Sequence, residues 1–179
     1  MKKEYYSIII RYLILIFIAF PNLYLFYLIF TPLTVYPVYF LLSIFSQVSL
    51  QINTLLINGF SIQIIEACIA GSAYYLLLIL NLSIPKINLK RRLKMILFGF
   101  LFLLILNIIR IFLITSLLLI NPFLFDLTHK IFWYFISIFF VIVIWFIEVK
   151  IFKIKQIPVY SDIKLLIKQM NKSKSSKKH

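Results

Sequence analysis

Three side chains of the sequence have the chemistry of a cysteine nucleophile and its helpers: Cys68, Arg110 and His129. An imidazole can take the proton of a thiol and later protonate a leaving amine. A guanidinium can favour the thiolate or stabilise a tetrahedral oxyanion. Each residue alone has a simpler explanation. A cysteine in an apolar segment usually only packs, a histidine at a loop edge is usually solvated, and the arginine could pair with Glu66 for structural reasons.

Three further polar residues accompany this trio. Asn107 precedes Arg110 by three residues, which places both on the same face of a helix. Asp126 precedes His129 by three residues and could orient the imidazole, although capping a helix is its simpler role. Glu66 lies two residues before the cysteine. It could pair with the arginine or the histidine, or lie at the membrane interface.

The cysteine and histidine counts limit the other chemistry that is available. The chain has one cysteine and two histidines, one of which is the last residue. These counts exclude an intrachain disulfide, a metal site with several cysteine ligands and a histidine-based metal centre. We therefore expect neither a metal nor a cofactor.

The composition assigns the chain to the membrane. Hydrophobic residues make up 63% of its 179 residues and charged residues only 13%, with a mean hydropathy of +1.04. A soluble domain has about a quarter charged residues, and a disordered chain has far fewer apolar ones. The net charge of +14 does not indicate nucleic-acid binding, because the basic residues lie in blocks between long apolar runs, as in loops beside a membrane.

We expect an all-α integral membrane protein whose membrane domain covers residues 1–149. Apolar runs of about 20 residues can cross the hydrocarbon core as helices. The predicted transmembrane helices cover approximately residues 7–30, 66–84, 95–120 and 130–147. Residues 38–57 mix polar and apolar side chains and carry no Lys or Arg. They predict an amphipathic helix on the outer membrane surface, and the alternative is one more membrane span.

The basic blocks determine the predicted topology in the plasma membrane, because cytoplasmic loops are rich in Lys and Arg. The N-terminus, the loop at 86–94 and the tail at 150–179 are basic, and we place all three in the cytoplasm. The tail has an amphipathic pattern that predicts binding to the anionic inner leaflet. Arg110 then lies inside the bilayer, where an arginine costs roughly 2.5–3.5 kcal/mol, so it needs a partner or a polar cavity. The cysteine and the histidine lie at a similar depth, near the outer face.

Three separated motifs occur in a fixed order along the chain. Residues 66–73 (Glu-Ala-Cys-Ile-Ala-Gly-Ser-Ala) open a predicted helix, Asn107 and Arg110 form an Asn-x-x-Arg pattern in the next one, and His129 precedes the last. This ordered set resembles the motifs of the exosortase/archaeosortase membrane transpeptidases. The similarity covers roughly residues 61–147.

One departure from the family pattern is visible after the cysteine. Family members commonly have Ser or Thr and then Gly there, whereas this chain has Ile69 and Ala70, with glycine following at position 71. The chain therefore resembles a divergent, archaeosortase-like subgroup.

The resemblance implies a sortase-like cysteine transpeptidase or protease whose active site faces outward. On that basis Cys68 is the nucleophile, Arg110 stabilises the thiolate or the oxyanion, and His129 is the acid and base. The implied substrates are secreted proteins with a C-terminal sorting signal, made of a short recognition motif, an apolar helix and a basic cluster. Cleavage outside the membrane would pass through a thioester intermediate.

The alternative function belongs to a different class. The chain could be a small non-enzymatic multi-span membrane protein, a subunit or chaperone of a larger complex, whose polar residues hold helices together. That hypothesis predicts that Cys68→Ala has no effect.

Overall fold

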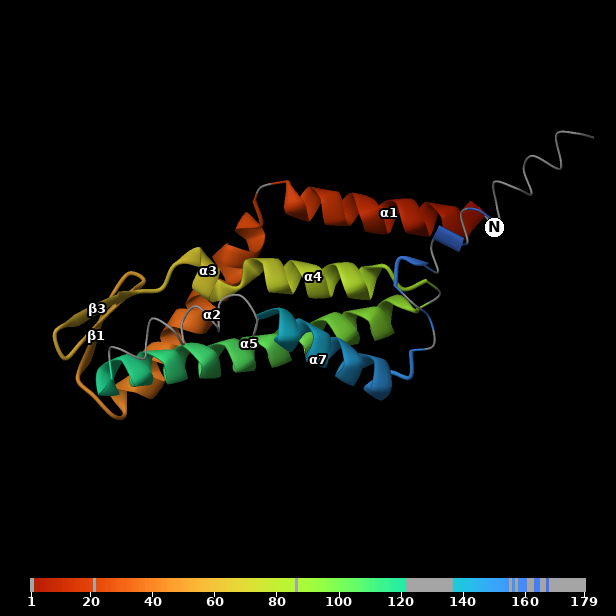
Figure 1. Cartoon of the computed structure of the whole chain (residues 1–179). Coiled ribbons are helices and arrows are strands. Elements are labelled where there is room, and N and C mark those ends of the chain that lie inside the picture. Colours follow the sequence, from red (N-terminus) through yellow and green to blue (C-terminus); the bar gives the residue numbers. More distant parts are fainter. Residues whose placement is uncertain are drawn as a thin grey trace, which may run out of the picture.

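The computed structural model of the chain is mostly helical and contains one small sheet (Figure 1). It describes residues 2–20, 22–85, 87–121, 137–154, 156, 158–160, 163, 164 and 167. Every statement about the structure refers to these residues.

The first apolar stretch forms two helices. α1 (Lys2–Ala19) and α2 (Tyr24–Ser43) are separated by a break in which Asn22 and Leu23 have left-handed backbones, with φ of 50° and 61°. A left-handed residue ends a right-handed helix, and asparagine adopts this conformation more readily than most residues. The single transmembrane helix expected over residues 7–30 is therefore divided.

The segment after α2 forms a three-stranded antiparallel sheet. β1 (Val48–Gln51), β2 (Thr54–Ile57) and β3 (Phe60–Gln63) are paired in the order β1-β2-β3. Leu55 and Ile57 of the central strand are fully buried and belong to the hydrophobic core. The sheet is thus anchored to the helical bundle through one face of β2.

The surface helix predicted over residues 38–57 is wrong. Its first part belongs to α2, which continues through Pro32 and Pro37, and its second part is the β1–β2 hairpin. The polar residues taken as one face of a helix alternate with apolar ones, which is the period of a strand. The turn that follows at Asn58 and Gly59, with φ of 48° and 85°, has positive φ at both residues, as a type I′ hairpin turn requires.

The helix predicted over residues 66–84 is also divided. α3 (Glu66–Ile69) is one turn long, Ala70 has a left-handed backbone with φ of 62°, and α4 (Gly71–Leu82) follows. α4 approaches α2 closely, since a Cβ at position 71 would lie 2.7 Å from a ring carbon of Tyr27. The glycine at the start of α4 therefore permits this contact.

Two long helices complete the bundle. α5 (Leu89–Ile120) contains the predicted helix at 95–120 and packs against α2, α4 and α7. α7 (Ser137–Ile151) contains much of the helix predicted at 130–147, whose first residues lie outside the described ones. Side chains spaced four residues apart form an exposed apolar stripe along one face of α5. These are Leu97, Leu101, Ile105, Ile109 and Leu113.

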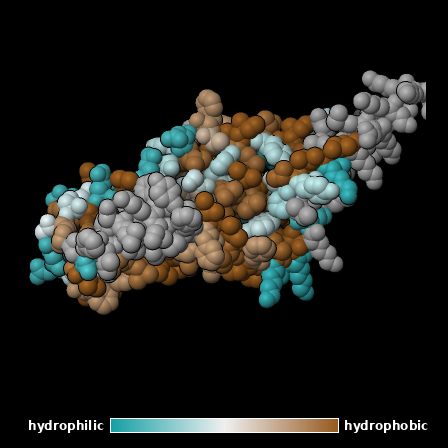
Figure 2. All heavy atoms as spheres, viewed as in Figure 1, coloured by the Kyte–Doolittle hydropathy of each residue, from teal (hydrophilic) through white to brown (hydrophobic). Residues whose placement is uncertain are grey.

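Two of the described helices, α2 and α5, are long and apolar enough to cross a membrane. Figure 2 shows apolar side chains over much of the middle of the bundle on the face in view. α4, with 12 residues, is shorter than the about 20 residues that span the hydrocarbon core. The described residues therefore contain two candidate membrane-spanning helices, and the four predicted spans remain a prediction.

The two ends of the bundle have different structures (Figure 1). The start of α1, the α4–α5 connection and the end of α7 lie together at one end, and the sheet and the end of α5 lie at the other. The segments at the first end carry or adjoin the basic residues that the sequence analysis placed together in the cytoplasm. This arrangement is compatible with the predicted topology, whose orientation in a membrane remains a prediction.

Two buried arginines bind the C-terminal end of α4. Nη1 of Arg11 donates to the carbonyl oxygens of Leu82 at 2.5 Å and of Ile84 at 3.1 Å. Arg92 donates to the same two carbonyls, at 2.6 Å and 2.7 Å. The last carbonyls of a helix lack partners within it and carry partial negative charge. The two guanidinium groups satisfy these carbonyls and tie α1 and α5 to α4.

A single carboxyl group joins three helices near the same end. Glu148 of α7 is fully buried, and its Oε2 atom accepts a hydrogen bond from Nδ2 of Asn81 in α4 at 2.9 Å. Its Oε1 atom lies against Gly99 of α5, where a Cβ atom would overlap it. α4, α5 and α7 therefore meet around this side chain, and only glycine leaves room for it.

We expect Gly99→Ala to destabilise the bundle by about 1–3 kcal/mol, because the added methyl group displaces the Glu148 carboxyl from Asn81. Thermal unfolding of the purified protein in detergent measures this change. In a Glu148→Ala background the methyl group no longer meets the carboxyl, so the same substitution should cost much less. An equal cost in both backgrounds would contradict the contact.

Candidate active site

The left-handed turn at Ala70 leaves backbone carbonyls that need donors from elsewhere. In a continuous helix the carbonyls of Cys68 and Ile69 would accept hydrogen bonds from amides four residues later. Here α5 supplies the donor: Nδ2 of Asn107 lies 2.9 Å from the carbonyl oxygen of Cys68 and 3.4 Å from that of Ile69. Asn107 is 2% exposed, so its amide group finds its partner inside the protein.

Arg110 binds the same carbonyl from one turn further along α5. Its Nη2 atom lies 3.2 Å from the carbonyl oxygen of Cys68, and its Nη1 atom lies 2.6 Å from Oγ of Ser137 in α7. The side chain is 7% exposed. Arg110 thus connects α3, α5 and α7. Its Nε atom is buried and has no hydrogen-bond partner among the described residues.

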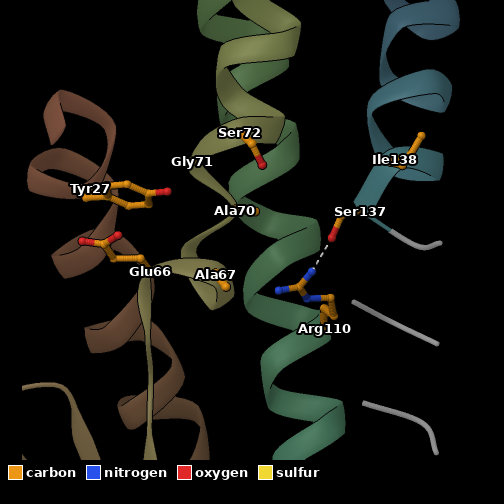
Figure 3. Close-up of a pocket in the computed structure, with 9 residues that line it drawn as sticks. All are labelled: Tyr27, Glu66, Ala67, Ala70, Gly71, Ser72, Arg110, Ser137 and Ile138. Atoms are coloured by element: carbon orange, nitrogen blue, oxygen red, sulfur yellow. Dashed lines mark hydrogen bonds between the residues drawn. The ribbon is translucent and has the colours of Figure 1, made fainter. Parts of the chain in front are cut away.

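A cavity of about 310 Å³ opens beside the guanidinium group. In Figure 3, Tyr27 of α2 and Glu66 of α3 lie on one side of it, and Arg110 and Ser137 lie on the other. Its remaining lining comes from the small residues of the α3–α4 connection and from Ile138. Glu66 and Arg110 share the cavity, and no ion pair joins these two residues. The sequence had left open an ion pair between Arg110 and Glu66, and this pair is not formed.

Cys68 is half-buried and its side chain packs against the hydrophobic core. The guanidinium of Arg110 lies within electrostatic range of it. The hydrogen bonds from Asn107 and Arg110 reach the cysteine's backbone carbonyl and hold this part of the chain in place.

The structure brings together three of the residues predicted from the sequence and places a fourth beside them. Cys68, Asn107 and Arg110 meet at the α3–α5 contact, and Glu66 lines the neighbouring cavity. The predicted acid and base His129 and its companion Asp126 lie outside the described residues. Their relation to the cysteine therefore stays a prediction.

Two residues of the site were missed by the sequence reasoning. Ser137 accepts the shortest hydrogen bond of Arg110. It is the only hydroxyl residue between Tyr134 and Glu148, and such a polar residue in an apolar helix is a signal that could have found it. Tyr27 lies in an aromatic-rich helix, where nothing distinguishes it from its neighbours.

The polar side chains that line the cavity are better suited to hydrogen bonds with a peptide than to metal binding. Within the described residues, no group of three His, Cys, Asp or Glu side chains lies together as a metal site requires. The cavity instead combines a guanidinium, a carboxylate and three hydroxyl groups from different helices. Such groups can bind the carbonyl and amide groups of a substrate.

Comparison of the chain with protein-family models, with curated proteins and with solved structures found no match. The resemblance to membrane transpeptidases therefore depends on the motifs alone, two of which the fold brings into contact.

Proposed function

We propose that this chain is a membrane-embedded, sortase-like cysteine transpeptidase or protease that cleaves a C-terminal sorting signal. One observation carries the proposal. Asn107 and Arg110, about forty residues away from Cys68 in the sequence, both donate hydrogen bonds to its carbonyl oxygen, beside a cavity. Two of the three motifs that suggested the activity thus form one site.

The proposed reaction divides amide cleavage into two steps. In the first, the Cys68 thiolate attacks the scissile carbonyl carbon and forms a tetrahedral oxyanion, which Arg110 stabilises by its charge. The amine departs with a proton from the His129 imidazolium, and a thioester remains. In the second, the imidazole takes a proton from an amine, lipid or water acceptor, which attacks the thioester and regenerates the thiol.

The proposed setting is the plasma membrane, which the chain crosses several times. The basic segments at one end of the bundle face the cytoplasm, so the sheet and the cavity face outward. α2 and α5 support this setting by their length and composition. The substrate's apolar helix enters sideways from the lipid, and the basic tail of the enzyme binds the anionic inner leaflet.

A second candidate function is supported by the same contacts. The hydrogen bonds of Asn107 and Arg110 reach a backbone carbonyl, which is what a purely structural connection between helices needs. A non-enzymatic subunit or chaperone of a membrane complex would use them in this way.

Cys68→Ala separates the two candidates. We expect cells that produce this variant to keep the sorting signal on their secreted proteins, because no thioester can form, whereas wild-type cells remove it. Mass spectrometry of the C-terminal peptides measures the difference. The variant should unfold at the wild-type temperature, since the change removes one half-buried sulfur atom. Identical C-terminal peptides in both strains would favour the non-enzymatic function.

Arg110→Ala tests the charge beside the thiol. Cys68 is the only cysteine, so labelling with a membrane-impermeant maleimide reports on it directly. We expect the labelling rate from outside at neutral pH to fall about tenfold, because an adjacent positive charge favours the thiolate.

Asn107→Ala is the matched control for this measurement. It removes a hydrogen bond to the same carbonyl but no charge, so it should not slow labelling. His129→Ala should slow labelling if the imidazole takes the thiol proton. Equal rates for all variants, or a cysteine that does not react from outside, would indicate a packing role.

A further inference from the structure

Strand β3 is an edge strand of the described sheet, and the chain continues from it directly to the candidate nucleophile. The order β1-β2-β3 leaves β3 at the edge of the sheet, with β2 as its only strand partner among the described residues. Its side chains at 60, 61 and 63 are exposed. Only four residues lie between the end of β3 and Cys68, and Glu66 of the cavity is one of them.

The register determines which backbone groups of β3 face away from the sheet. The amide of Ile64 donates to the carbonyl oxygen of Asn53 at 2.9 Å, so these two residues occupy a hydrogen-bonded position of the ladder. Because such pairs alternate along antiparallel strands, Ile62 and Phe60 also bond to β2. The N–H and C=O groups of Ser61 and Gln63 consequently point outward.

We propose that the outer edge of β3 binds the recognition motif of the substrate as an added strand. This proposal rests on the proposed function and specifies how its substrate is recognised. An extended peptide would hydrogen-bond to the backbone of Ser61 and Gln63, and its following residues would reach Cys68 and the cavity. Main-chain hydrogen bonds supply the affinity in such strand addition.

The direction of the chain makes a peptide that enters the membrane the suitable occupant. β3 runs from the hairpin tip toward α3 and the bundle (Figure 1). A sorting signal also runs from an outer motif into an apolar helix. The added strand is therefore parallel to β3, and its C-terminal end arrives at Cys68.

The opposite edge of the sheet is different. β1 is the other edge strand, but it packs against α2 and is separated from α3 by two strands. By the same alternation, Leu50 directs its backbone groups outward there. A peptide on that edge would not be led to the cysteine, so β1 provides a matched control.

The test uses the full-length protein in lipid vesicles with a peptide library as the probe. Each peptide has a randomised segment of about six residues, an apolar helix of about 20 residues and a Lys/Arg cluster. Mass spectrometry identifies peptides that wild type cleaves and Cys68→Ala does not. The best of these is then N-methylated at one backbone position at a time.

We expect N-methylation to lower kcat/KM about fivefold or more at alternate positions and to have little effect between them, since every second amide faces β3. Ser61→Pro removes one outward N–H and should raise KM without unfolding the sheet. Leu50→Pro, which removes an outward N–H on the opposite edge, should leave cleavage unchanged. Thermal unfolding checks that both proline variants remain folded.

Other outcomes would contradict strand addition, the parallel orientation or the proposed function itself. Cysteine-dependent cleavage that Ser61→Pro and N-methylation leave unaffected would overturn strand addition and keep the proposed function. Photo-crosslinkers at positions 61 and 63 should capture peptide residues on the N-terminal side of the cleaved bond, and capture of residues on its C-terminal side would overturn the parallel orientation. A library without any Cys68-dependent cleavage would overturn both proposals.

Discussion

The candidate site depends on how the chain satisfies its backbone where the helix is broken at Ala70. A left-handed residue there ends α3 after one turn and leaves the carbonyl of Cys68 without a helical donor. A carbonyl that is shielded from water must find its hydrogen-bond donor within the protein. Asn107 and Arg110 do this from α5, so the need for hydrogen bonds is what brings a guanidinium to the cysteine.

The other end of α4 follows the same principle with different residues. Its last carbonyls are bound by Arg11 from α1 and by Arg92 from α5, and Asn81 at that end binds the buried Glu148 of α7. A short helix is thus held at both ends by polar side chains from its neighbours. These contacts determine its position along α5, and with it the position of the α3 turn.

The sequence singled out residues that the structure brings into contact, but it missed much of the fold around them. The cost of an arginine in an apolar helix, and its spacing from Asn107, identified two residues that the structure places beside Cys68. The breaks at residues 22–23 and 70 depend on left-handed backbones, for which hydropathy gives no signal. The sheet was missed because its apolar content over 48–63 resembles that of a surface helix, although its alternation and the turn at Asn58 were visible.

A structural role for Arg110 is compatible with the proposed catalytic one, because hydrogen bonds to its neighbours leave the positive charge of the guanidinium in place. Nη1 and Nη2 bind Ser137 and the Cys68 carbonyl, which fixes the plane of the guanidinium group. Nε is buried without a partner among the described residues, beside a cavity that this arginine lines. If the proposed function holds, the guanidinium would act on a substrate through its charge, which these hydrogen bonds already hold in a fixed orientation.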